Sequence, residues 1–372
     1  MLNIKEVKTK RDIKEFVEFP LRLYKGNPYF VPPMYADEVK LLKNGGNRDV
    51  ADSVFFLAER DGKTVGRIQG IIQKQFNKLH STSRVRFTRF DSIDDTEVSR
   101  ALFSAVAEWG KATGMTELCG PLGYNDLDRE GLLIEGFDED STFEEQYSYE
   151  YYPRLVEDFG LEKEIDWLEF EIKAPEKPNE MLTRVAKRTL EMNKLHVADT
   201  SLSKKAYISK YRDQFFEVLD ECYSKLYGTV PISDDVKDEL VEQFMLILNK
   251  EYLIIVCDEN ERMVAFGLCF PHIGDALKKS GGRLTPAAII KLLRIAKNPK
   301  CIDLGLVAVL PEYRNVGINA VIMDKLQEYL NSGKLERAET NLNLETNTAV
   351  MAQWKHFSAR QHKRRRSYVK SI

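Results

Sequence analysis

Two stretches of the chain repeat the same order of apolar and polar positions. Each begins with two apolar segments joined by a short polar turn, at 55–72 and 252–270, which predicts a β-hairpin. A third apolar segment then leads into a stretch with apolar residues at helical spacing, which ends at Gly114 or Gly333. A short strand-like segment follows each glycine. The repetition predicts a duplicated α/β unit.

The best candidate for a linker lies between these stretches, at 172–180, where two prolines stand among charged residues. We therefore predict an α/β fold with two domains, 1–172 and 173–372. Each should be a mixed, mostly antiparallel sheet flanked by helices. The second copy is longer, chiefly by the segment 275–300, which has no counterpart in the first.

Composition excludes several classes of protein. The 58 acidic and 55 basic residues give a net charge of −3, which argues against a nucleic-acid partner. No signal-peptide core and no run of 18 apolar residues is present, so we expect a cytoplasmic protein with no membrane partner. The five cysteines are widely spaced and are interpreted as reduced thiols. The five histidines have no metal-ligand spacing, so no metal is expected.

The second copy has an informative strand-to-helix junction, "VLPEYRNVGIN", at 309–319. The first turn of a helix leaves amide N–H groups unpaired, and the helix dipole adds partial positive charge there. Gly317 would let a ligand approach the backbone, and Arg314 is a cation beside it. The junction therefore predicts a phosphate site. The strand before it could pair with an extended arm of the ligand.

This string resembles motif A of the GCN5-related N-acetyltransferase (GNAT) superfamily, in which a strand leads through Pro-x-x-Arg and Arg-x-x-Gly into a helix. The resemblance implies two GNAT-like domains and acetyl-CoA, or another acyl-CoA, as cosubstrate. Its pyrophosphate would lie on the loop and its pantetheine arm along the strand. The cofactor-binding residues implied here are Val307, Val309, Arg314, Asn315, Val316, Gly317, Ile318 and Asn319.

The resemblance covers 181–372 well. It includes one further match, at Asn347, and two departures. Asn347 stands where the family has a cofactor-contacting Asn. Asn319, however, replaces the usual Gly or Ala and would place a larger side chain near the pyrophosphate. Trp354 replaces a Tyr that in many members protonates the leaving thiolate, and an indole N–H is not a proton source. The usual general acid is therefore missing or supplied elsewhere.

The first copy shares only the order of elements with the family. Asp94, Asp95 and Glu97 stand where its loop would meet phosphate, and like charge would repel the ligand. We interpret 1–172 as a degenerate copy, kept as a scaffold or a substrate platform.

The implied function is acyl-CoA-dependent N-acyl transfer, with acetyl passing to a small-molecule or peptide amine by direct attack in a ternary complex. Amides near Val307 and Val309 would polarise the thioester carbonyl. Glu345 and Asp303 are the candidate catalytic bases by position. Two alternatives stay open. One is a non-catalytic CoA-binding or ligand-sensing module, and the other is a FemAB-type aminoacyl transferase.

Three charged segments have alternative interpretations. The segment 124–152 carries ten acids, and it is either a solvated loop or a wall on which Glu145, Tyr147 and Tyr149 bind a cationic substrate. The basic run 363–366 is interpreted as protective charge on a final edge strand. The basic helix predicted within 275–300 should cover the acceptor cleft or the gap between the halves.

Overall fold

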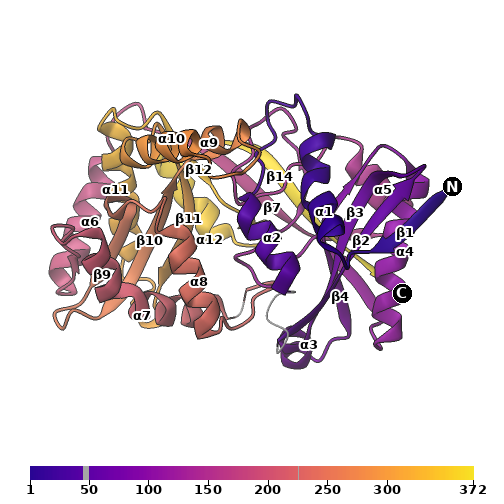
Figure 1. The fold of residues 1–372 in the computed structure, drawn as a ribbon. Helices are drawn as coiled ribbons and strands as arrows, with labels where there is room; N and C mark the ends of the chain where they lie inside the picture. The colour runs from indigo at the N-terminus through magenta and orange to yellow at the C-terminus, as the bar shows by residue number, and fades with distance from the viewer. Residues whose placement is uncertain (45–49, 225) are drawn as a thin grey trace. The chain divides into compact units, whose positions relative to one another are not determined.

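The computed structural model describes residues 1–44, 50–224 and 226–372 (Figure 1). The chain divides into two compact α/β units, so the predicted fold class is confirmed. Unit 1 comprises Met1–Leu168, Gly274–Ile289 and His362–Ile372, and unit 2 comprises Glu169–Ile273 and Ile290–Gln361. These units differ from the predicted contiguous domains, because two segments of the C-terminal half belong to unit 1.

Unit 1 is built on a mixed sheet in the order β1-β2-β3-β4-β5-β14, and β6 also pairs with β14. All its neighbouring strands are antiparallel except β4 and β5, which run parallel. The strands are β1 (Leu2–Glu6), β2 (Ala51–Arg60), β3 (Lys63–Gln73), β4 (Arg84–Ser92), β5 (Glu117–Gly120), β6 (Leu132–Glu135) and β14 (Ser358–Ser371).

Helices cover both faces of this sheet. The buried residues Leu102 and Val106 of α4 pack over Gly66 and Gly70 of β3, where a Cβ at Gly66 would lie 2.8 Å from the Leu102 side chain. The other face receives α1, whose Phe16 packs edge-on against Phe55 of β2. The helices are α1 (Lys10–Leu23), α2 (Tyr35–Asn44), α3 (Lys74–His80), α4 (Thr96–Ala112), α5 (Tyr152–Asp158) and α9 (Gly274–Lys278).

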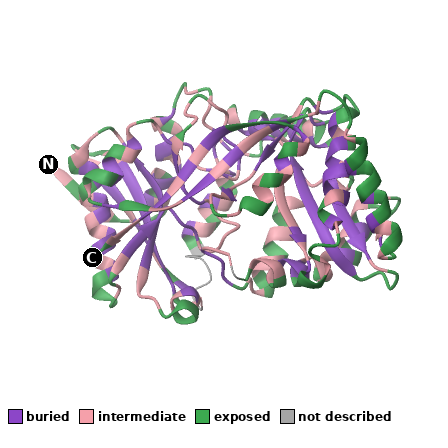
Figure 2. Cartoon of the chain, turned by 180° about the vertical axis from the view of Figure 1, so that it is seen from behind, coloured by how far each residue is buried: buried purple, intermediate pink, exposed green. Residues whose placement is uncertain are grey.

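Unit 2 has a sheet with the corresponding order, β7-β12-β11-β10-β9-β8. Here β11 and β12 are the parallel pair, and the other pairings are antiparallel. Figure 2 shows that its central strands are buried. The strands are β7 (Glu162–Lys173), β8 (His196–Val197), β9 (Leu253–Cys257), β10 (Met263–Pro271), β11 (Cys301–Val309), β12 (Arg337–Thr340) and β13 (Asn343–Leu344).

Two layers of helices enclose the unit 2 sheet. Phe215 of α7 and Phe244 of α8 stack on Phe266 and Phe270 of β10. The opposite face receives α11, and α6 packs on α11, where Thr183 donates a 2.6 Å hydrogen bond to Asp324. The helices are α6 (Glu180–Met192), α7 (Lys204–Tyr223), α8 (Asp234–Phe244), α11 (Ile318–Asn331) and α12 (Thr348–Met351). Helix α10 (Pro286–Lys297) begins in unit 1 and belongs to unit 2 from Ile290 onward. No described helix is long and apolar enough to cross a bilayer.

Each unit takes its sixth strand from the other half of the chain. The last strand of the first half, β7, pairs with β12 in unit 2 through Glu171 and Ile172. The last strand of the second half, β14, pairs with β5 in unit 1 over 368–371. This reciprocal exchange explains why a single linker does not separate the units.

The interpretation of 363–366 as protective charge on an edge strand is wrong. Lys363 and Arg365 are buried, and the run pairs with the acidic segment of unit 1. The Lys363 ammonium donates to the Asp140 carbonyl at 2.9 Å, and Arg366 bonds the Asp166 carboxylate at 2.8 Å. The basic run therefore neutralises buried acids.

Part of the basic segment 275–300 also packs within unit 1. Lys278 forms an ion pair with Asp140 at 2.7 Å, and Arg283 forms one with Glu18 at the same distance. The Tyr35 amide donates to the Gly282 carbonyl at 3.0 Å. These contacts fix the stretch that precedes α10. The predicted role of the helix itself, which was expected to cover the acceptor cleft or the gap between the halves, stays a prediction.

Candidate active site

The central feature of unit 2 is a split between its two parallel strands. The pairing of β11 with β12 runs from Cys301 to Leu304 and ends there, whereas β11 continues beside β10 as far as Val309. The register with β10 slips at the same place, so Gly305 is an extra residue in β11. Such a bulge bends a strand. A Cβ at Gly305 would lie 2.9 Å from the Phe270 ring, so glycine suits this bend.

The end of α7 contacts β11 beyond the split. The Tyr223 hydroxyl donates to the Val307 carbonyl at 3.1 Å and accepts from the Val307 amide at 3.3 Å. The Cys222 thiol donates to the Val309 carbonyl at 3.2 Å, and burial raises its pKa. These side chains meet the same backbone groups that were predicted to pair with the pantetheine arm.

The predicted phosphate loop follows directly after β11. Arg314, Asn315 and Asn319 are exposed, as is Val316, while Ile318 anchors the helix in the core. No described side chain caps the N-terminus of α11, whose cap residue is Gly317 at φ 97°. A Cβ there would lie 2.5 Å from Thr189 Oγ1. The first-turn amides are therefore left without a side-chain acceptor, as an anion site at a helix N-terminus requires.

A buried acid–imidazole pair lies at the base of the split. Asp303 of β11 is 1% exposed, and its Oδ1 lies 2.8 Å from Nδ1 of His272, which follows β10. Burial, with the nearby Asp303 charge, raises the pKa of the Cys269 thiol to about 12. The pair has the arrangement of a general base whose imidazole is held by a carboxylate. Asp303 was predicted from the sequence, and His272 was not.

Two neighbouring residues complete this polar cluster. His272, Cys301 and Glu339 place potential ligand atoms within 4.8 Å of one another. Glu339, however, lies 3.3 Å from the Arg337 guanidinium, and His272 contacts Asp303. We assign no metal to this group, because its charges are already engaged by protein partners.

The strand-to-helix turn after β13 holds the other predicted site residues. Asn347 caps α12, since its side chain accepts from the Val350 amide at 3.3 Å. Glu345 is half-buried on the same turn. Trp354 is buried, and its indole N–H has no hydrogen-bond partner within the described part of the chain. An unsatisfied buried donor costs roughly 1–3 kcal/mol, so a bound acceptor atom at this position would stabilise it.

Unit 1 has a corresponding split, and the chain itself fills it. The pairing of β4 with β5 ends at Arg86, and a bulge follows near Arg89. Beyond this point the Tyr152 hydroxyl accepts from the Ser92 amide at 3.2 Å, and the Tyr151 hydroxyl donates to the Ser92 carbonyl at 2.8 Å. The end of the acidic segment 124–152 thus covers the backbone edge of β4 beyond the split.

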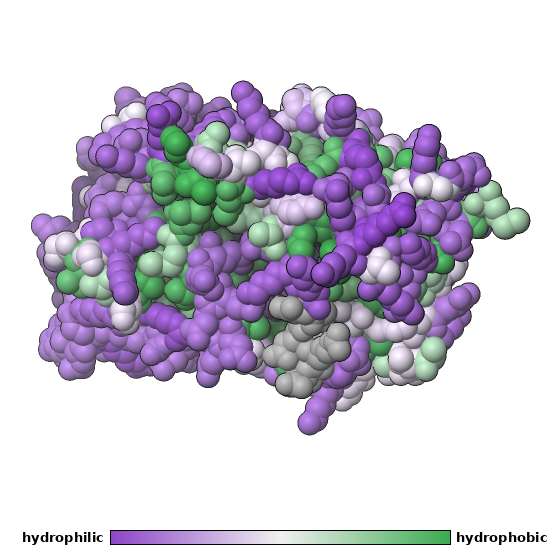
Figure 3. Space-filling view, viewed as in Figure 1, coloured by the Kyte–Doolittle hydropathy of each residue, from purple (hydrophilic) through white to green (hydrophobic). Residues whose placement is uncertain are grey.

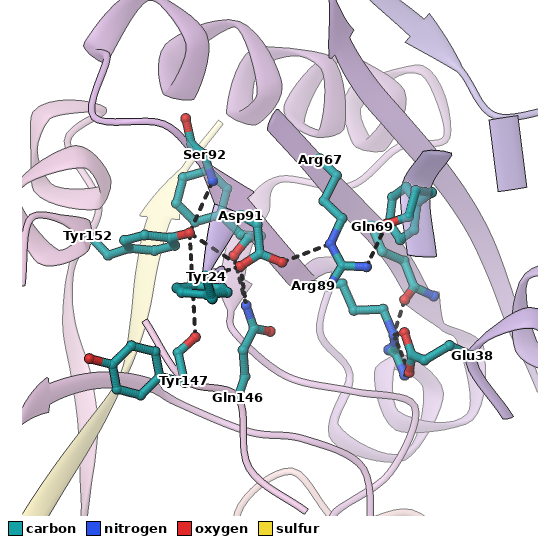
Figure 4. Close-up of polar contacts among 12 residues, drawn as sticks. Tyr24, Glu38, Arg67, Gln69, Arg89, Asp91, Ser92, Gln146, Tyr147 and Tyr152 are labelled. Atoms are coloured by element: carbon teal, nitrogen blue, oxygen red, sulfur yellow. Dashed lines mark hydrogen bonds and ion pairs between the residues drawn. The ribbon is translucent and has the colours of Figure 1, made fainter. Parts of the chain in front are cut away.

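Buried charged residues hold the segment 124–152 in place (Figure 4). Asp91 receives hydrogen bonds from Arg67 at 2.7 Å and from Tyr24 at 2.9 Å. Its pKa is raised because it is fully buried. The Gln146 side chain donates to the Phe90 carbonyl at 2.8 Å. Arg67 thus neutralises the buried Asp91 carboxylate, and Gln146 attaches the segment to the end of β4.

The structure places the three predicted substrate residues in unit 1. Tyr147 is buried, donates to the Phe137 carbonyl at 2.7 Å and packs against Tyr24. The Tyr149 hydroxyl donates to the Leu23 carbonyl at 3.3 Å. Glu145 is buried 3.5 Å from Arg365. These contacts are those of a packed core, and the predicted role in amine binding stays a prediction.

The N-terminus of α4 differs from that of α11. The Asp95 carboxylate accepts from the amides of Glu97 and Val98, and so caps the helix. Arg60 pairs with Asp95 at 2.7 Å and with Glu97 at 2.6 Å. The amides that a phosphate would use are therefore occupied by a carboxylate of the chain.

No family model matches the chain. Among solved structures, a tandem GNAT protein from the clavulanic acid biosynthesis pathway gives a TM-score of 0.56 at 12% identity, over 100% of this chain and 98% of that one. The fold is that of a tandem GNAT protein. A GCN5-related glucosamine N-acetyltransferase region of a fungal β-N-acetylglucosaminidase gives a TM-score of 0.57 at 10% identity, over 100% of this chain and 38% of that one. The predicted resemblance to tandem GNAT-like halves is confirmed.

Two sequence relatives also cover most of this chain. Protein YghO of Escherichia coli (strain K12) is 26% identical over 371 residues, which span 98% of this chain and 94% of that protein. The bacterial ceramide synthase of Caulobacter vibrioides (strain NA1000 / CB15N) is 25% identical over 296 residues, which span 78% of this chain and 76% of the synthase.

Proposed function

We propose that unit 2 transfers an acyl group from an acyl-CoA thioester to an amine. The observation that carries this proposal is the continuity of the site, in which residues 305–309 leave β12 and lead directly into the uncapped N-terminus of α11. Backbone groups of the strand suit an extended amide-rich arm, and the helix amides suit its pyrophosphate. The tandem GNAT fold supports acyl transfer in general.

The mechanism needs one base, one oxyanion donor and one acid. The amine nitrogen forms a bond to the thioester carbon, the carbon–sulfur bond breaks, and CoA leaves as a thiolate. His272, held by Asp303, accepts the proton of the amine, with Glu345 as the second candidate. The Val307 amide faces the developing oxyanion once Tyr223 has withdrawn from it. The thiolate takes its proton from the Tyr223 hydroxyl or from water, because Trp354 has none to give.

The first donor to test is acetyl-CoA, as the motif resemblance implies. A second candidate combines a longer acyl-CoA with a long-chain amino alcohol, because a ceramide is the N-acyl derivative of such an amine and one relative is a ceramide synthase. Both reactions use the same atoms of the site and differ only in the length of the two chains.

Two measurements on the full chain test the proposal. Calorimetry with CoA reports binding, and a thiol-release assay pairs acetyl-CoA or palmitoyl-CoA with a short amine, a peptide and a long-chain amino alcohol. Thiol release that requires both an acyl-CoA and one of the amines is the expected result. Binding without turnover would favour a non-catalytic CoA module. Absence of CoA binding would favour an aminoacyl transferase of the FemAB type.

A further inference from the structure

Helix α10 carries aliphatic residues on both of its sides. One side is buried through Ala288, Leu292 and Ala296. The other side exposes Ile290 by 53% and Leu293 by 47%. A helix that only covers a protein core has a polar outer face, so this pattern indicates that the outer face also contacts something apolar.

The charge on this outer face has one sign. Lys291, Arg294 and Lys297 are exposed between and beside the two apolar side chains. The chain contains no acidic residue from Ala276 to Ile302. Lys278 and Arg283, which precede the helix, pair with acids of unit 1. The helix itself therefore presents aliphatic and cationic groups together.

The neighbourhood of α10 has the same character. Leu284, two residues before the helix, is 40% exposed. Figure 3 shows hydrophobic residues gathered in the region of α10, at the upper left of the view, with hydrophilic residues around them. The apolar area is thus wider than the two helical side chains.

We propose that this basic apolar face, formed by Ile290, Leu293, Arg294 and Lys297 of α10, binds an anionic membrane surface. Amphipathic helices that lie in the membrane interface combine aliphatic side chains, which enter the acyl boundary, with Lys and Arg, which meet the lipid phosphates. At 12 residues, α10 is too short to span a bilayer and long enough to lie on one. The contact is therefore peripheral, and it agrees with the finding that no described helix could cross a bilayer.

The face is also connected to the proposed catalytic site along the chain. Only residues 298–300 separate α10 from β11, whose third residue is Asp303. A membrane contact at α10 would bring a lipid-soluble amine close to the unit that uses it. Binding to the membrane does not depend on acyl transfer, so the two proposals can fail separately.

Co-sedimentation of the full chain with vesicles tests the proposal. We expect binding to vesicles of phosphatidylglycerol and phosphatidylcholine, and weak binding to phosphatidylcholine alone. The I290S/L293S variant should bind the anionic vesicles about tenfold more weakly, since two aliphatic side chains no longer enter the interface. The R294Q/K297Q variant should lose most of the preference for anionic lipid.

A matched variant separates this face from exposed leucines in general. L79S/L202S removes two exposed leucines from α3 and from the loop before α7, and should bind as the wild type does. Unaltered circular dichroism shows that each variant is folded. Failure of the wild type to sediment with anionic vesicles overturns the proposal, as does equal binding by I290S/L293S. Capture of an acidic protein through Ile290, without vesicle binding, would assign the face to a protein partner instead.

Discussion

The hydroxyl of Tyr223 bonds both backbone groups of Val307, donating to the carbonyl at 3.1 Å and accepting from the amide at 3.3 Å. It therefore occupies the edge of β11 in the way that a paired strand or an extended ligand would. In unit 1 two tyrosines do the same at Ser92. The difference is that a whole buried segment supports the contact in unit 1, whereas the end of one helix supports it in unit 2.

Tyr223 should compete with the pantetheine arm of CoA. We expect Tyr223→Phe to tighten CoA binding about fivefold. In this variant CoA no longer has to displace a protein hydrogen bond that is worth roughly 1 kcal/mol. Calorimetry measures the change. Tyr207→Phe is the matched control, since this residue lies on the same helix and its hydroxyl bonds the Leu253 carbonyl instead. Weaker CoA binding by Tyr223→Phe would show that the hydroxyl assists the ligand rather than opposing it.

Asp303 should act through His272. Asp303→Asn removes the charge that stabilises the protonated imidazole, so turnover should fall by roughly ten- to a hundredfold, as expected for a weakened general base. CoA affinity should not change, because the pair lies outside the phosphate loop. His272→Ala should lose at least as much activity, and the double variant should lose no more than His272→Ala alone. Fully additive losses would mean that the two residues work independently.

Asn319 lies in the first turn of α11, where a negative charge has two opposite effects. Asn319→Asp should raise the stability of the helix by roughly 0.3–1 kcal/mol through its dipole. The same charge should weaken CoA binding about tenfold at low salt, because it repels the pyrophosphate. Asn331→Asp makes the same change at the other end of the helix and should leave CoA binding unaltered. If the Asn319→Asp variant bound CoA with wild-type affinity, the pyrophosphate could not lie at this turn.

The charge network of unit 1 should make the stability of this unit depend on pH in the acid range. Burial alone would raise the pKa of Glu38, but Arg89 and Arg129 more than offset this and lower it from 4.5 to about 2. That difference corresponds to about 3 kcal/mol of stability, which is complete above pH 4.5 and is lost as the pH falls towards 2. The stability gap between the wild type and Glu38→Gln should therefore narrow from pH 7 to pH 3.

Urea unfolding at the two pH values measures this gap. Glu108→Gln, on the exposed side of α4, is the control and should show little difference at either pH. A gap for Glu38→Gln that stays constant between pH 7 and pH 3 would contradict the assignment of a depressed pKa to this carboxyl.

Local patterns predicted much of the fold. Both hairpins and both strand-to-helix units follow from the hydrophobic period and from glycine and proline signals within a few tens of residues. The strand exchange was not predictable in this way, because the partners of β7 and β14 depend on pairing between distant segments. The basic run at 363–366 was misread for the same reason, since its acidic partners lie about 200 residues earlier in the chain.

The site shows the same limit. Gly317 and Arg314 carry a local motif, and Asp303 lies on the strand that leads to it. Tyr223 and His272 have no local signal, because they reach β11 from 84 and 31 residues away. The acidic segment 124–152 was recognised as unusual, but only the structure shows that it fills the split of unit 1.

The number of CoA molecules bound by one chain tests the central claim most directly. Of the two helices that follow a split strand in the described residues, α11 has an N-terminus that no side chain caps, whereas Asp95 caps α4 and residues 151–152 cover its strand. Calorimetry of the full chain should therefore give one CoA per chain, and Asn319→Asp should weaken that single site. Two sites of similar affinity, or one site unaffected by Asn319→Asp, would contradict the account.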